Sequence, residues 1–299
     1  MRLGNFEINE PVPELRDPHL MVVLKPWIDV GAVGTLALET LERHLGAENL
    51  GTLARPGEFY DFTRYRPTIR RFEGERQITL PNSELWWARG QGDFDWLFLH
   101  LLEPHIKSED LLDSIVAVMQ HFGVKRYALV GAMYGTGPHT RPLLASGSST
   151  DPAIQQLMEP IGMGVSTYEG PTSVMALATE EASKLGAESM SLLIQLPPYA
   201  RLDEDHKGHE ALLRYLGILY DWGLDLSEIK QDGERQYSEV DKATQADRQM
   251  RGVVRRLEEA YDAGDLRGLD ESEDEDYDSA ELPSAVEDFL KDLEDREDD

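Results

Sequence analysis

The sequence of 299 residues contains no cysteine. This absence excludes disulfide bonds, zinc sites built on thiolates and cysteine nucleophiles, and it fits a reducing compartment. Long apolar runs are absent too, since none approaches the roughly 20 residues that span a bilayer. The N-terminal stretch MRLGNFEINEPVPEL lacks the apolar core of a secretory signal. We therefore expect a soluble, cytoplasmic protein.

Basic residues are scarce. The chain has 29 Lys and Arg against 57 Asp and Glu, which gives a formal net charge of −28. Residues 262–299 alone hold 18 acidic and three basic side chains, so this short stretch carries −15 of the total. Because phosphate groups are repelled by such a chain, we expect no nucleic-acid partner and no binding to anionic membranes.

Short apolar runs alternate with amphipathic patterns along the first two thirds of the chain, which is typical of strands and helices around one sheet. A hairpin is predicted over 68–81, with its turn at Glu73 and Gly74, and an edge strand over 84–90. The pattern predicts an α/β fold with a mostly parallel sheet. The predicted buried strands are 19–27, 95–102, 124–132 and 189–197, and the predicted helices are 33–46, 108–122, 151–158 and 171–185.

From residue 206 onward the patterns are helical only, with one helix near the start of this region and a long, charged helix over 234–261. We therefore predict three parts. An α/β core domain occupies residues 1–205, a C-terminal helical subdomain that caps it occupies 206–264, and an acidic tail occupies 265–299.

The tail is predicted to be largely disordered, because residues 265–283 cannot bury enough apolar surface to offset chain entropy. Residues 284–297 then show a short amphipathic helical pattern. Such a helix on an acidic tether is suited to binding a partner or the chain's own body, and a solvated, frayed tail is the plain alternative. The side chains predicted to bind a partner are Val286, Phe289, Leu290 and Leu293.

The glycine-rich stretch LVGAMYGTGPHTRP, residues 129–142, is the main candidate for chemistry. It lacks the lysine of a phosphate-binding Walker loop, and Thr140 stands where a dinucleotide fingerprint needs its last glycine. No G-x-S-x-G nucleophile elbow follows. The stretch therefore fits neither a known phosphate loop nor a serine hydrolase.

His139 and Arg141 follow a predicted strand, at the sheet edge where open α/β folds place their ligands. One hypothesis is that they act as a base and an anion clamp. The other is that Gly135 and Gly137 permit a sharp turn, which both side chains brace through hydrogen bonds.

The candidate ligand or interaction crevice consists of Asp29, His139, Arg141 and Tyr168, which a nucleoside or a phosphorylated ligand would suit. We assign no catalytic residue, because no nucleophile and base pair is recognisable. Neither a cofactor nor a metal is expected. His206 and His209 lie beside three acidic residues, yet carboxylates are favoured at a helix start in any case.

Five segments together resemble the PAC2 family, which is named for a proteasome assembly chaperone subunit. The resemblance covers roughly residues 20–260. It implies a three-layer α/β/α sandwich similar to purine nucleoside phosphorylases and related hydrolases, protein partners, and self-association as a homo-oligomer such as a trimer. The segments are WIDVGAVGTLALETL (27–41), EPH (103–105), LVGAMYGTGPHTRP (129–142), YEGPTSVMALATEEASKLG (168–186) and IQLPPYA (194–200).

One feature departs from the family. Some archaeal members dock on the proteasome through their last three residues, which are a hydrophobic residue, a tyrosine and any residue, in that order. This chain instead ends in Glu297, Asp298 and Asp299. The ending argues against the same docking.

Two functional hypotheses follow. The first is a non-enzymatic, oligomeric protein-binding module of the assembly-chaperone type. The alternative is a protein that binds a small molecule, or a hydrolase or phosphorylase-like enzyme, using the crevice near His139 and Arg141. An unpaired Arg141 in a deep pocket would favour the alternative. Pairing of Arg141 with buried carboxylates or backbone carbonyls would favour an architectural role.

Overall fold

The computed structural model describes residues 1–72, 74–158, 170, 172–220 and 222–264. The chain forms two compact units, which are described separately below. The first comprises Met1–Asp29, Gly34–Gly131 and Ser146–Leu193, and the second comprises Val30–Val33, Ala132–Ala145 and the chain from Ile194 onward. No helix in the described ranges is long and apolar enough to cross a membrane. The predicted division at residues 205 and 264 stays a prediction.

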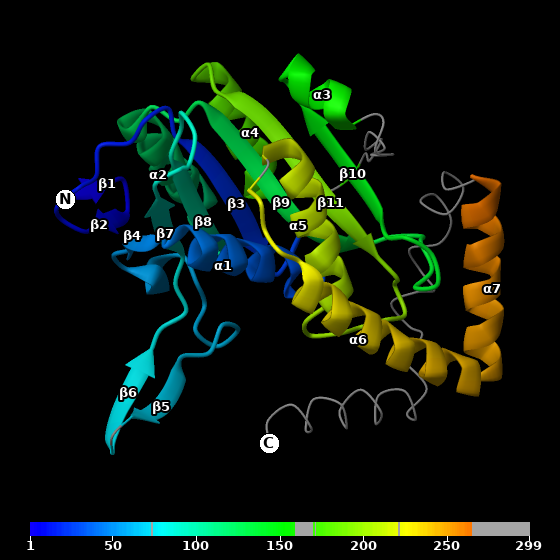
Figure 1. The fold of residues 1–299 in the computed structure, drawn as a ribbon. Coiled ribbons are helices and arrows are strands. Elements are labelled where there is room, and N and C mark those ends of the chain that lie inside the picture. Colours follow the sequence, from blue (N-terminus) through cyan, green and yellow to red (C-terminus); the bar gives the residue numbers. More distant parts are fainter. Residues whose placement is uncertain (73, 159–169, 171, 221, 265–299) are drawn as a thin grey trace. The chain divides into compact units, whose positions relative to one another are not determined.

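The described residues form one large sheet of nine strands, in the order β1-β2-β4-β7-β8-β3-β9-β11-β10 (Figure 1). The strands are β1 (Arg2–Leu3), β2 (Phe6–Ile8), β3 (His19–Lys25), β4 (Glu48–Leu53), β7 (Glu84–Ala88), β8 (Trp96–Leu102), β9 (Arg126–Tyr134), β10 (Leu144–Ser149) and β11 (Glu188–Leu196). β3 and β8 form the centre of the core. The side chains from Leu20 to Leu24 have no exposed surface, which matches their uninterrupted apolar pattern.

The sheet is mixed, so the expectation of a mostly parallel sheet was wrong. β3 runs parallel to β8 and β9, whereas the pairs β1 with β2, β2 with β4, β4 with β7, and β7 with β8 are antiparallel. Residues 89–95 alone join β7 to β8, and a parallel crossover needs a dozen residues or more. β7, predicted at an edge, lies between β4 and β8.

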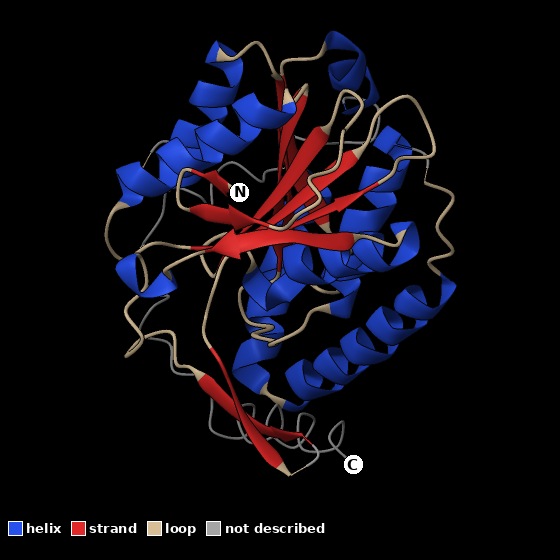
Figure 2. Cartoon of the chain, turned by 90° about the vertical axis from the view of Figure 1, so that its left-hand side faces the viewer, coloured by secondary structure: helices blue, strands red, loops and turns tan. Residues whose placement is uncertain are grey.

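Helices lie on both sides of the sheet, as expected for a layered α/β fold (Figure 2). They are α1 (Val33–Leu45), α2 (Ser108–Phe122), α3 (Pro152–Met158) and α4 (Val174–Lys184). α2 shows why the sequence forms these helices. It buries Leu111, Ile115, Val118 and Met119 at helical spacing, and it ends at Gly123, whose left-handed backbone (φ 65°) closes the last turn.

A hairpin projects from the first unit, as predicted, and forms a separate two-stranded sheet (Figure 1). Its strands are β5 (Thr68–Phe72) and β6 (Glu75–Thr79), and every residue in both strands is exposed. Residue 73, in the predicted turn, lies outside the described residues. We call residues 64–80 the arm.

The second unit contains three long helices, α5 (His206–Tyr220), α6 (Ser227–Ala246) and α7 (Arg248–Ala263). The prediction of a single helix over 234–261 was wrong, because the chain breaks at Asp247. There the backbone is extended, and the carboxylate accepts hydrogen bonds from the backbone N of Gln249 (2.6 Å) and Met250 (2.9 Å). An aspartate cap of this kind begins a new helix.

Close packing joins α5 to α6. A Cβ atom added at Gly233 would lie 2.9 Å from the backbone N and Cα of Lys207, so the two helices approach at backbone distance. The Tyr237 hydroxyl, one turn along α6, donates to the buried Asp205 carboxylate at 3.0 Å. α7 packs on a small apolar core that consists of Tyr199, Ala200, Val240, Met250, Val254 and Leu257.

Candidate functional site

His139 is held from both ring nitrogens inside the second unit. The Tyr199 hydroxyl accepts from the His139 backbone N (2.9 Å) and lies 2.7 Å from Nδ1, while Nε2 lies 3.3 Å from Oδ1 of Asp241 on α6. Because the Asp241 carboxylate can only accept, Nε2 carries the proton of the neutral ring, and Nδ1 then accepts from the Tyr199 hydroxyl. Burial lowers the pKa of His139, against the opposing effect of Asp241. The imidazole is therefore a neutral brace between the loop and α6.

Arg141 is held by α7. Its Nε and Nη2 donate to the two carboxylate oxygens of Asp262 at 2.9 and 2.7 Å. Its Nη1 donates to Glu258 (3.3 Å) and weakly to the carbonyl of Thr140 (3.4 Å). The side-chain bond to Asp262 raises the pKa of Arg141. A fork–fork pair of this kind occupies the guanidinium edge that an anionic ligand would use.

Two further bonds connect the same loop to α7. The Thr140 hydroxyl donates to Glu258 at 2.6 Å, and the Tyr261 hydroxyl donates to the carbonyl of Pro142 at 3.2 Å. Together with Arg141, three consecutive positions of the loop contact three positions of one helix face, since 258, 261 and 262 are three and four residues apart. The loop is a support for α7.

Gly135 has a different role from the predicted one. Neither Gly135 nor Gly137 has a positive φ, so a left-handed turn is not what requires glycine here. A Cβ atom at Gly135 would lie 2.6 Å from the Cβ of Gln195, and its backbone N donates to the carbonyl of Leu196 at 2.9 Å. Glycine at 135 permits this close approach.

Asp29, in the first unit, caps α1. Its Oδ1 accepts from the backbone N of Thr35 (3.0 Å) and its Oδ2 from the Thr35 hydroxyl (2.6 Å), so the carboxylate satisfies a donor in the first turn of the helix. Burial raises the pKa of Asp29, against the opposing bonds from Thr35. Gly34 lets α1 pack tightly, because a Cβ atom there would lie 2.6 Å from Cγ2 of Val23.

The structure brings only part of the predicted crevice together. His139 and Arg141 lie in one loop of the second unit, Asp29 lies in the first unit, and Tyr168 lies outside the described residues. The tail side chains Val286, Phe289, Leu290 and Leu293 also lie outside the described residues. The four-residue crevice therefore stays a hypothesis.

A cavity in the first unit was missed by sequence reasoning. It measures about 970 Å³ and lies where β3 and β8 end, the ligand position of an open α/β sheet. The rings of Tyr65 and His105 contact each other there, with their centroids 4.7 Å apart. Burial in the same place raises the pKa of Glu103. The EPH motif after a predicted strand was the available signal. The main lining residues are Pro26, Tyr60, Arg64, Tyr65, Glu103 and His105.

Comparison with known proteins identifies the family. The model of the PAC2 family matches residues 23–244, about three quarters of the chain. The chain belongs to the PAC2 family. Among curated proteins, none matches it.

Solved PAC2-like structures share this fold. A PAC2 family protein from Streptomyces avermitilis is 28% identical, with 76% of this chain and 95% of that chain covered and a TM-score of 0.67. A proteasome-assembly chaperone homologue from Mycobacterium tuberculosis is 23% identical, with coverages of 79% and 99% and a TM-score of 0.68. An archaeal proteasome activator from Pyrococcus furiosus is 16% identical, with coverages of 79% and 97% and a TM-score of 0.62. The likeness to the last two concerns the fold alone.

In this PAC2 protein the Tyr199–His139–Asp241 chain has the form of a proton relay. Burial raises the pKa of the Tyr199 hydroxyl, which keeps it protonated near neutral pH. The hydroxyl contacts both the backbone N and the ring Nδ1 of His139, so its hydrogen bonds both hold the loop. Within the described residues, no group of three or more His, Asp or Glu side chains is placed to hold a metal ion. The arrangement is suited to fixing the loop to α6.

Proposed function

We propose that this PAC2 protein is a non-enzymatic, oligomeric protein-binding module of the assembly-chaperone type, located in the cytoplasm. The observation that carries the proposal is the engagement of Arg141 with Asp262 and Glu258. These carboxylates are partly exposed, unlike the buried partners that we expected, yet they occupy the guanidinium as fully. The side chain best placed for anion binding is thereby used to position α7.

Family membership supports protein partners. Structures with this fold include a proteasome-assembly chaperone homologue and an archaeal proteasome activator. Residues 284–297 interleave apolar side chains with acidic ones at helical spacing. We propose that partners are bound through this amphipathic pattern, with Phe289 and Leu290 as its central apolar contacts.

Affinity capture of the full chain from its native cells, followed by mass spectrometry, tests this function. We expect specific protein partners, and we expect them to be lost from a chain lacking residues 284–299 and from the variant Phe289→Asp/Leu290→Asp. The matched control is Lys291→Asp/Arg296→Asp, which adds acidic residues to the same segment at polar positions and should retain the partners. Unchanged capture by all variants would remove the tail from the proposal.

The alternative of a small-molecule function has one observation in its favour, the cavity beside Tyr65 and His105. A metabolite that the full chain turns over, with loss of turnover in His139→Gln or Arg141→Ala, would contradict the non-enzymatic proposal. Turnover or binding that responds to Tyr65→Ala instead would place the activity in that cavity.

A further inference from the structure

The arm is the most exposed apolar feature of the first unit. Ile69, Phe72 and Ile78 are 53%, 63% and 58% exposed, and Leu80 follows at 46%. Every residue in both strands is exposed, so a large part of each of these side chains faces solvent. A two-stranded hairpin is marginal in water by itself, so a partner that covers its apolar side chains would stabilise it.

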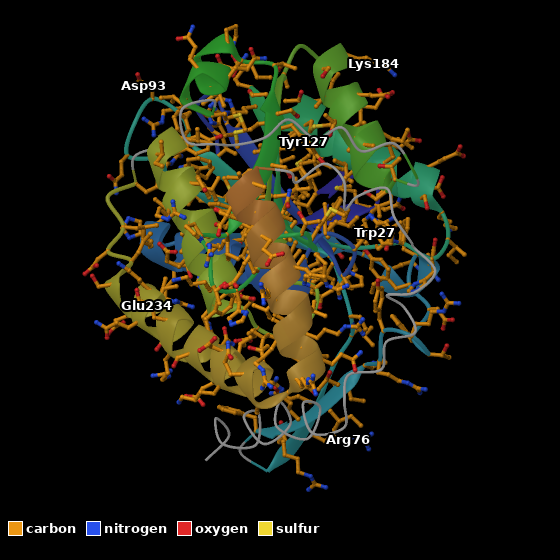
Figure 3. All side chains as sticks on the ribbon, turned by 90° about the vertical axis from the view of Figure 1, so that its right-hand side faces the viewer. Trp27, Arg76, Asp93, Tyr127, Lys184 and Glu234 are labelled. Atoms are coloured by element: carbon orange, nitrogen blue, oxygen red, sulfur yellow. The ribbon has the colours of Figure 1, made fainter. Side chains whose placement is uncertain are left out.

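The arm is also basic in an acidic chain. Its sequence contains five arginines and two glutamates, against a net charge of −28 for the whole chain. In the described residues, no ion pair joins the side chains of Arg66, Arg70, Arg71 or Arg76 to a carboxylate. Figure 3 shows the side chain of Arg76 directed away from the ribbon, near the hairpin end.

Both properties share one face of the hairpin. Ile69 lies opposite Ile78, and two residues along, Arg71 lies opposite Arg76. Because side chains alternate between the faces of a strand, the isoleucine pair and the arginine pair project to the same side. This face offers an apolar strip beside a cationic one.

The chain itself contains a segment with the complementary chemistry. Residues 284–299 hold eight acidic and two basic side chains, interleaved with Phe289, Leu290 and Leu293. The segment lies outside the described residues, and its complementarity to the arm is one of charge and apolar sequence pattern. Its predicted apolar stretch, as a helix of roughly three turns, would measure about 15 Å. A five-residue strand measures about 17 Å, so the lengths agree.

We propose that the arm of one copy binds residues 284–299 of a neighbouring copy, with Phe289 and Leu290 on the isoleucine pair and the carboxylates beside the arginines. The inference rests on the oligomeric function proposed above. A chain that carries both halves of a contact is self-complementary, as every closed homo-oligomer requires. If two copies each bind the other's residues 284–299, the contact closes a dimer. If each copy binds these residues of the next copy in a ring of three, it closes a trimer. Electrostatic attraction adds orientation and partner selection.

Because the chain has no cysteine, introduced thiols give a direct test. One full-length chain carries Ile78→Cys, and a second, distinguishable by a mass tag, carries Leu290→Cys. After mixing and mild oxidation, we expect a disulfide-linked heterodimer on a non-reducing gel as the main covalent product. A mixture without that heterodimer would overturn the proposal, as would a doubly substituted chain that closes only its own monomer.

Charge reversal tests the role of the arginines. Arg71→Glu/Arg76→Glu in the arm should reduce the heterodimer yield by about tenfold, since attraction at two positions of this face becomes repulsion. The matched control, Arg248→Glu/Arg256→Glu on α7, makes the same change in net charge and should leave the yield unaltered. Adding Asp288→Lys/Glu294→Lys to the other chain should restore the yield with the reversed arm. Equal losses from arm and control would overturn the assignment.

The two proposals fail differently. Sedimentation velocity of the full chain reports oligomers however they form, and affinity capture reports other partners. Oligomers or partners without the cross-link would overturn the arm contact alone. A chain that is monomeric and captures no partner would overturn the proposed function as well.

Discussion

At the scale of single residues, the side chains that sequence reasoning ranked as chemical serve as supports. His139 binds two different groups and Arg141 binds three, and every one of these bonds ends on the loop itself, on Tyr199 or on a C-terminal helix. The residue types and the loop were predictable from sequence. Their partners were not, because Asp241, Glu258 and Asp262 are about 100 residues away in a chain rich in carboxylates.

A pH dependence of stability is expected from His19. Its ring stacks on the ring of Phe94, with the two centroids 3.9 Å apart. Burial, aided by the charge of Arg126, lowers the pKa of His19 to about 4. An unfolded histidine titrates near about 6.5, so between these values the unfolded state binds more protons. The contribution of His19 to the free energy of unfolding is therefore complete above about pH 6.5. It is lost as the pH falls toward 4, which lowers the free energy of unfolding by at most about 3 kcal/mol.

The variant His19→Phe keeps the stacked ring and removes the titration. Urea unfolding at a series of pH values from about 4 to 7.5 should show a shallower decline for the variant than for the native chain. His121→Phe, at an exposed position late in α2, is the control and should leave the slope unaltered. Parallel curves for the native chain and His19→Phe would contradict the assignment.

At the scale of elements, the helix break at Asp247 sets which surface α7 presents to the loop. The amphipathic pattern correctly predicted helical structure here. It cannot distinguish one long helix from two helices that are separated by a single capping residue, because the helical spacing of apolar residues looks the same in both cases. The strand order shows a similar limit. Alternation and apolar runs predict strands, but direction depends on the length and path of connections, as in the seven residues from β7 to β8.

Arg141→Ala should loosen α7. Without the guanidinium, Asp262 loses its partner on the loop and Glu258 keeps only the Thr140 hydroxyl, while the two negative charges remain close together. Amide hydrogen exchange measured by mass spectrometry should therefore become severalfold faster in residues 248–263, with little change in α2. Arg255→Ala removes only an exposed pair with Glu259 on the same helix and should have no comparable effect. Equal exchange in all three chains would contradict the bracing role.

At the scale of the whole molecule, charge limits the choice of partners. The arm is basic, and residues 262–299 carry −15 of the net charge of −28. We expect the full chain to leave duplex DNA unshifted in gel electrophoresis at about 150 mM salt, because too few cations are available to displace condensed counterions. A salt-sensitive shift would contradict this, and its loss in Arg71→Glu/Arg76→Glu would assign it to the arm.

Much of the fold was predictable from the sequence, because core strands and helices repeat one simple pattern over many residues. β3, β8 and α2 were found within two residues of their bounds. β10, with the polar sequence LASGSS, was missed, since burial of its alternate residues depends on neighbours that are distant in sequence. The PAC2 resemblance gave the correct family from five weak motifs, where the site chemistry alone pointed in two directions.

The backbone contact between Gly233 and Lys207 has a consequence for engineering. Even alanine at 233 would force α5 and α6 apart, and the hydrogen bond from Tyr237 to Asp205 would stretch with them. A buried carboxylate that loses its donor is a costly defect. Anyone attaching a probe or an affinity handle to α6 should therefore choose its outward positions, such as Glu234, and leave the crossing point untouched.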